Sequence, residues 1–253
     1  MNWALFHLRI AAALAAGIAF APAALAINER CSVPLIYVEP LAQLQRTTIA
    51  AKRDRKLNIL LLSGSPSQTG ALKGMRSYPS YLDDALHHRF PNLAIKLTVR
   101  AAPRRTVKEL LSTLDKLLQE TRPSLVIWQA GTADAYRGLD ADAFAESLHM
   151  GISTILRSGA DVILVDLQYS PRTDQLIDAN DYRASMRNVA NATDVPLFSR
   201  YDIMRFWNDF GVFDLASLRN NGLYEKVHSC IGELLASFVA RATDLREFQE
   251  AGK

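Results

Sequence analysis

The sequence predicts an α/β fold with a parallel sheet of five strands covered by helices on both faces. Apolar runs of strand length alternate with longer segments of helical periodicity from residue 57 to residue 247. Strands that alternate with helices are joined by crossover connections, which make the sheet parallel and place helices on both of its faces. Hydrophobic residues make up 49% of the 253-residue chain, enough for the core of one large domain.

The strands are expected where short apolar runs occur. These runs are residues 58–62, 93–99, 125–128, 161–167 and 196–198. The second run alternates apolar and polar side chains, which is typical of a strand near the sheet edge. The fourth run is mostly apolar, which is typical of a strand buried on both faces.

The helices are expected where apolar side chains recur with helical spacing. They are residues 38–52, 78–90, 106–120, 141–158, 180–192, 200–210 and 223–245. The third has the strongest apolar stripe and ends before Pro123, which cannot continue a helix. Parallel sheets bind ligands beyond the carboxyl ends of their strands. The candidate functional loops are therefore those after Leu62, Val99, Trp128 and Leu167.

The N-terminal segment predicts a signal peptide over residues 1–26. Arg9 is its only full charge, and an apolar run follows that ends in the small-x-small tripeptide 24–26. We therefore expect export to the periplasm or the medium, with residues 27–56 as an N-terminal arm and linker. The alternative, an uncleaved membrane anchor, is disfavoured by Pro22. No later apolar run approaches the length of a membrane span.

The charge and the histidine pattern argue against nucleic-acid, metal and cofactor binding, and the cysteines favour a disulfide. The formal net charge is only +3, which is too balanced to predict nucleic-acid binding. The histidines are scattered and lack partners at ligand spacing, so neither a metal site nor a cofactor is expected. The two cysteines, Cys31 and Cys230, favour a disulfide in an oxidising compartment. Two buried free thiols are the alternative.

Three stretches resemble, in their order and spacing, the conserved blocks of SGNH/GDSL-type ester hydrolases. They read LNILLLSGSPSQTG (57–70), SLVIWQAGTAD (124–134) and NGLYEKVHSCIG (221–232). The resemblance covers nearly the whole mature chain and implies a flavodoxin-like, doubly wound domain over residues 57–247. It also implies cleavage of esters, often acyl groups on carbohydrates or lipids. Such enzymes use a serine nucleophile, preplaced oxyanion donors, and a histidine base oriented by a carboxylate.

The reactive positions of that family carry other side chains in this sequence. Pro66 stands at the nucleophile position, and proline has neither a hydroxyl to attack with nor an N–H to donate. Ala133 replaces the oxyanion asparagine. Asn221 and Tyr224 replace the aspartate and the histidine. The resemblance therefore predicts a catalytically degenerate hydrolase fold that binds a glycan, an acyl ligand or a protein partner in the old cleft.

The expected cleft includes the loop residues around these positions. They are Gly64, Ser65, Ser67, Gly131, Thr132, Asp134 and Arg104. Asp134 matches the acidic residue that closes the third-strand motif of the family, and we expect it to brace the loop through backbone hydrogen bonds. Arg104 belongs to an arginine-rich loop beside the cleft, which makes an anionic ligand conceivable.

Two other interpretations remain open. In a shifted register Ser65 is the nucleophile, and Glu225 with His228 forms an acid–histidine dyad, which would give an active periplasmic esterase or deacetylase. Glu225 and His228 also share a helix face simply by i, i+3 spacing. The third interpretation is a non-catalytic subunit that partners an active paralogue or an acyltransferase.

Overall fold

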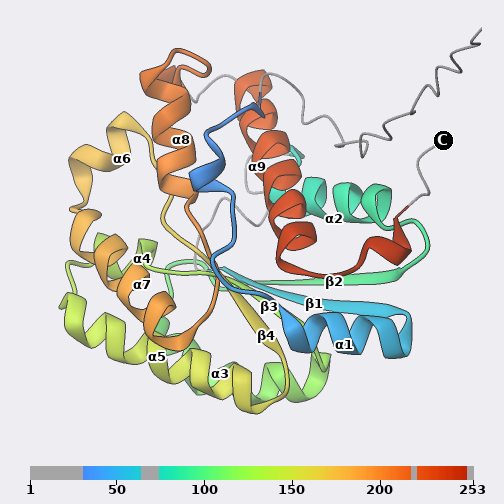
Figure 1. The fold of residues 1–253 in the computed structure, drawn as a ribbon. Helices are drawn as coiled ribbons and strands as arrows, with labels where there is room; N and C mark the ends of the chain where they lie inside the picture. The colour runs from blue at the N-terminus through green and yellow to red at the C-terminus, as the bar shows by residue number, and fades with distance from the viewer. Residues whose placement is uncertain (1–30, 64–73, 218–220, 250–253) are drawn as a thin grey trace, which may run out of the picture.

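The computed structural model describes residues 31–63, 74–217 and 221–249 (Figure 1). Its centre is one sheet of five parallel strands in the order β2-β1-β3-β4-β5. The strands are β1 (Lys56–Ser63), β2 (Ala94–Ala101), β3 (Leu125–Gln129), β4 (Asp161–Val165) and β5 (Leu197–Phe198). The predicted parallel sheet is confirmed, including the edge position of the second strand.

Helices connect the strands and cover both faces of the sheet. They are α1 (Gln45–Asp54), α2 (Tyr78–Arg89), α3 (Val107–Thr121), α4 (Thr132–Tyr136), α5 (Ala141–Arg157), α6 (Pro171–Leu176), α7 (Asn180–Thr193), α8 (Arg200–Asp209) and α9 (Asn221–Ala242), with short 3-10 helices η2 (Leu35–Tyr37), η4 (Leu215–Ser217) and η5 (Arg246–Phe248). In Figure 1, α3, α5 and α7 lie on one face of the sheet, and α2 and α9 lie on the other.

The strand order reverses between β1 and β3, and this positions the site. The chain leaves β1 to form β2 on one side and then returns to form β3 on the other side of β1. Ser63 at the end of β1 is in register with Gln129 at the end of β3. A ligand crevice is expected where strand order reverses, beyond these two residues.

The predicted N-terminal helix is shorter than its pattern suggested. Instead of residues 38–52, the helix occupies Gln45–Asp54, and a 3-10 turn precedes it. Pro40 disfavours helical backbone at Glu39, so the arm stays irregular there. The Leu44 amide then donates to the Ala242 carbonyl, which anchors the start of α1 to the end of α9.

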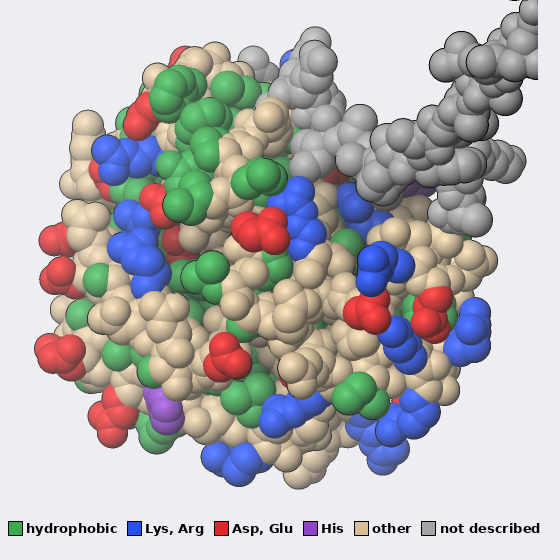
Figure 2. Space-filling model, in the orientation of Figure 1, with side chains coloured by type: hydrophobic (Ala, Val, Ile, Leu, Met, Phe, Trp, Pro, Cys, Tyr) green, Lys and Arg blue, Asp and Glu red, His purple; other side chains and the backbone are tan. Residues whose placement is uncertain are grey.

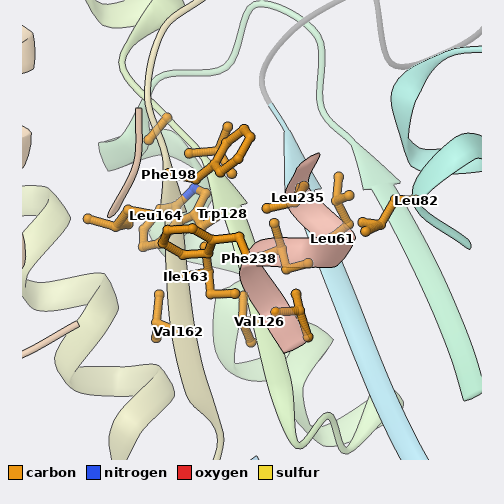
Figure 3. Close-up of a cluster of buried hydrophobic side chains, with 14 of the residues drawn as sticks. Leu61, Leu82, Val126, Trp128, Val162, Ile163, Leu164, Phe198, Leu235 and Phe238 are labelled. Atoms are coloured by element: carbon orange, nitrogen blue, oxygen red, sulfur yellow. The ribbon is translucent and has the colours of Figure 1, made fainter. Parts of the chain in front are cut away.

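The core fills the space between the central strands and the helices. Figure 3 shows Leu61 of β1 and Val126 of β3 beside Leu82 of α2 and Leu235 and Phe238 of α9. All five side chains are fully buried. Because both faces of the sheet are covered, residues of β1, β3 and β4 that point either way enter the core.

Trp128 belongs to the core and does not line the cleft. It is fully buried on β3. A Cβ atom at Gly151 of α5 would lie 2.3 Å from Trp128 Cη2, so only glycine fits there. The indole ring therefore fixes how closely α5 approaches the sheet.

The N-terminal arm is tied to α9 by a disulfide between Cys31 and Cys230, with Cα atoms 5.1 Å apart.

Figure 2 shows Lys and Arg side chains interspersed with Asp and Glu on one face of the molecule, and hydrophobic side chains gathered at the upper left, over α8. No helix within the described ranges combines the length and the apolar character of a membrane span.

Candidate functional site

A buried polar cluster lies at the carboxyl ends of β1 and β3. The Ser63 hydroxyl donates to Gln129 Oε1 at 3.3 Å, and the Tyr78 hydroxyl donates to the same oxygen at 3.1 Å. All three residues are buried. Tyr78 is the first residue of α2, so this cluster joins the two central strands to the helix that follows the first functional loop.

The predicted nucleophile loop lies outside the described residues. This applies to Gly64, Ser65, Pro66 and Ser67. The assignment of Ser65 or Pro66 to the nucleophile position therefore stays a prediction from the sequence.

The loop after β3 turns sharply into α4. Gly131 has a φ of 88°, and a Cβ atom there would lie 2.8 Å from Leu167 Cδ1, so glycine is required. The next residues are Thr132, whose buried hydroxyl has no hydrogen-bond partner in the described part of the chain, and Ala133. A hollow of about 10 Å³ adjoins this turn, room for about one water molecule. Ala133 has no side-chain hydrogen-bond donor to offer at this turn.

Asp134 connects this turn to the start of α3. Its carboxylate accepts the Val107 amide at 3.1 Å (Oδ1) and 3.3 Å (Oδ2). Burial raises the pKa of Asp134, and the Val107 N–H opposes that rise. Arg104 is exposed, and its carbonyl accepts a hydrogen bond from Arg137 Nη2 at 2.7 Å. Asp134 and the backbone of Arg104 therefore both hold neighbouring loops of the protein in place.

The first two turns of α9 bring Tyr224 and His228 to the polar cluster. Asn221 is the first residue of the helix, and its side chain is outside the description. Tyr224 is buried, with its ring centroid 4.0 Å from that of His228. His228 Nδ1 accepts the backbone N–H of Tyr78 at 3.0 Å. The α9 residues therefore face the N-terminus of α2.

This hydrogen bond fixes the chemical state of His228. Since Nδ1 accepts an amide proton, a neutral imidazole must carry its own proton on Nε2. Burial, helped by the nearby positive charge of Arg200, lowers the pKa of His228 from 6.5 to about 3, so the ring is neutral. The base of a serine hydrolase has the opposite arrangement, because its Nδ1–H donates to a carboxylate and its Nε2 accepts.

Glu225 is not joined to His228. Neither a hydrogen bond nor an ion pair links the two side chains in the described structure, and Glu225 instead acts electrostatically on Arg76 and Tyr81. The i, i+3 spacing thus places Glu225 and His228 on neighbouring parts of one helix without coupling them.

Arg200 is the site residue that the sequence did not single out. It is the first residue of α8 and only 2% exposed. Its Nη2 donates to Gln168 Oε1 at 3.3 Å, and its Cζ lies 5.9 Å from the centroid of the Tyr78 ring. Burial lowers the pKa of the guanidinium. The only sequence signal was its place just after the fifth strand, at the same end of the sheet as the functional loops.

The match of residues 30–245 to a family model, the Non-GDSL lipase-like family, decides the assignment. The chain belongs to the Non-GDSL lipase-like family. The resemblance to SGNH/GDSL-type hydrolases is thereby confirmed at the level of the family and the fold. No curated protein sequence matches the chain.

Solved structures, two of them esterases, share the fold of this family member. TesA superposes with a TM-score of 0.55 at 18% identity, covering 71% of this chain and 99% of TesA. The esterase EstA from Pseudoalteromonas sp., inhibited by monoethylphosphonate, gives 0.56 at 18% identity, covering 72% and 98%. The acetylxylan esterase Axe2 from Geobacillus stearothermophilus gives 0.59 at 14% identity, covering 72% and 94%. At these identities the similarity establishes the fold.

A second buried acid lies close by but belongs to another network. Asp166 follows β4, and burial raises its pKa to about 7. Its Oδ1 accepts the Tyr201 amide at 2.8 Å, and its Oδ2 lies 3.8 Å from Arg183 Nε. Arg183 also pairs with Asp202, so these charges tie α7 to α8. Groups of three or more metal-ligating side chains do not occur in the residues that the structure describes.

Proposed function

We propose that this Non-GDSL lipase-like protein is exported and binds an acyl or glycan ligand in the cleft beyond β1 and β3 without hydrolysing it. The observation that carries the proposal is the state of His228. It is the only histidine that reaches the polar cluster in the described part of the chain, its Nδ1 is occupied by an amide, and its pKa of about 3 leaves it a poor base.

The replaced family positions support the same conclusion. Loss of a catalytic nucleophile or base lowers the rate by a factor of about 10⁶. Loss of one oxyanion donor lowers it by about 10²–10³. Pro66, Ala133 and Tyr224 together remove groups of each kind, so little of a hydrolase's rate enhancement would survive. The disulfide and the N-terminal sequence support export.

The test is an ester-hydrolysis assay on the purified mature protein. Short-chain aryl esters and acetylated sugars are the substrates, and Ser65→Ala and His228→Asn are the matched variants. We expect no turnover above background in any of the three proteins, together with saturable binding of an acylated sugar by calorimetry. The same preparation, secreted from cells, should begin at Ile27 on N-terminal sequencing.

A restored variant shows whether the scaffold can still support the chemistry. Pro66→Ser, Ala133→Asn, Asn221→Asp and Tyr224→His together return the family residues to one chain, and hydrolysis by this variant alone would support the proposal. Wild-type turnover that disappears in Ser65→Ala and in His228→Asn would overturn it and establish the Ser65–His228 esterase.

A further inference from the structure

We infer that Arg200 binds the carboxylate group of an acidic ligand, a carboxylic acid or an acidic sugar, at the carboxyl end of the sheet. This inference rests on the proposed function, because it assigns a chemical class to the ligand that the proposed function places in the same cleft.

The Arg200 guanidinium is buried without a charged partner. In the described part of the chain, no carboxylate oxygen lies within ion-pairing distance of it, and its one hydrogen bond goes to the neutral amide of Gln168. Its Nε is buried and has no acceptor there. Arginine is almost never fully buried unless it is paired, because an uncompensated buried cation costs stability. A ligand anion would supply the missing partner.

Arg200 lies beside aromatic residues from the first turns of two other helices. Arg200 is the first residue of α8, Tyr78 is the first residue of α2, and Tyr224 lies in the first turn of α9. Tyr78 and Tyr224 both lie close enough to Arg200 to feel its charge. The N–H groups at a helix N-terminus carry a partial positive charge, so the position of Arg200 at the start of α8 favours a bound anion over a cation.

The nearest acid within the described chain does not neutralise this potential. Asp166 acts on Arg200 electrostatically, but its oxygens are engaged by the Tyr201 amide and by Arg183. Asp166 therefore serves the α7–α8 network, and Arg200 keeps its charge for another partner.

The surroundings of Arg200 fit a carboxylate. A planar guanidinium donates two parallel hydrogen bonds to the two oxygens of a carboxylate. Arg200 is the one cation that acts on both Tyr224 and His228 in the described structure, which matches a ligand of single negative charge. The Nε2–H of the partly buried His228 is a further donor, and the Tyr224 ring packs against this histidine with centroids 4.0 Å apart. Gln168 and His228 are only partly buried, so the cluster reaches the protein surface.

The test is calorimetric titration of the mature protein with two pairs of probes. Hexanoate is compared with hexanol, and galacturonate with galactose, so that each pair differs in the carboxylate and the two pairs separate an acyl source from a sugar source. We expect saturable binding of at least one acid and none of its neutral partner. Arg200→Met should weaken that binding at least tenfold.

Arg89→Met is the matched control. Arg89 is another partly buried arginine, but it lies at the opposite end of α2 from Tyr78, where its Nη2 donates to Ser237. Its variant loses the same charge and should bind the acid as wild type does. Thermal melting should show that Arg200→Met is at least as stable as wild type, since an apolar side chain of similar length replaces an unpaired buried charge.

A readout on the wild-type protein covers the case in which Arg200→Met does not fold. The Arg200 Nε–H resonance, assigned with Arg200→Lys, should shift on addition of the bound acid and not with its neutral partner. Acid binding that is unchanged in Arg200→Met, or binding of inorganic phosphate alone, would overturn the inference. If the protein binds only neutral acylated sugars, the inference about Arg200 is wrong and the proposed function stands. If the protein hydrolyses esters and binds an acid in a way that depends on Arg200, the proposed function is wrong and the inference stands.

Discussion

The low pKa of His228 predicts an acid-sensitive contribution of this residue to the stability of the fold. Folding moves the pKa of this histidine from 6.5 to about 3, so the folded protein holds the ring neutral while the unfolded chain protonates it below 6.5. For a pKa that is lowered on folding, the stabilisation is complete above the unfolded value and is lost as the pH falls towards the folded value. The loss should therefore develop between pH 6.5 and pH 3.

The magnitude follows from the linkage relation. Each pH unit below the unfolded pKa costs about 1.4 kcal/mol of unfolding free energy while the folded ring stays neutral. At about pH 5 the His228 contribution alone should lower the free energy of unfolding by about 2 kcal/mol relative to pH 7.5. Asp166 acts in the opposite direction, because burial raises its pKa and favours the fold at lower pH. Comparing how the free energy of unfolding changes with pH in wild type and in a His228 variant separates the contribution of His228 from that of Asp166.

The assay is urea unfolding of wild type, His228→Asn and His149→Asn at both pH values. Asparagine keeps an acceptor for the Tyr78 amide but cannot be protonated, so His228→Asn should lose about 2 kcal/mol less than wild type on acidification. His149 is exposed, and its variant should follow wild type. Nitrogen NMR should show the proton of His228 on Nε2. Equal acid sensitivity in wild type and His228→Asn, or a proton on Nδ1, would refute the reasoning and reopen a role for His228 as a base.

Two further predictions concern the scaffold. The double variant Cys31→Ser, Cys230→Ser should have a free energy of unfolding lower than that of wild type by up to about 5 kcal/mol, because in the chain-entropy model the bridge closes a loop of 199 residues. Thiol titration of the denatured, unreduced wild-type protein should find no free thiol. Asp134→Ala should lower the free energy of unfolding by about 1–2 kcal/mol, since the Val107 amide at the start of α3 loses its acceptor. Asp134→Asn keeps an acceptor and should lower it less. Equal decreases in the two variants would contradict the role of Asp134 as the acceptor for the start of α3.

The fold could be predicted because its signals are local. The apolar stripe of α3 and the apolar run of β4 each specify an element within a short stretch of sequence, and their alternation specifies the parallel sheet. The short helices α4 and α6 were missed because one or two turns are too few to establish a helical period.

The side-chain arrangement of the site could not be predicted in the same way. Spacing placed Glu225 and His228 on one helix, but the partner of His228 is the amide of Tyr78, which lies 150 positions away in the chain. That contact depends on how α2 packs against α9, which no local pattern encodes. Arg200 was missed for the same reason, since its burial depends on Gln168 and Tyr78, from two other segments of the chain.

The proposed loss of catalysis does not by itself account for the buried polar cluster. A cleft with no remaining role gains stability when its buried polar groups are replaced by apolar ones, because each such group costs free energy unless it is hydrogen-bonded. Here Gln129 receives two hydroxyl donors and His228 receives an amide, so those groups are accommodated. Arg200 carries a full charge at the start of α8, with one neutral acceptor among the described residues. A bound anion explains that arrangement, whereas the serine-hydrolase mechanism does not, since no step of that mechanism requires a buried guanidinium.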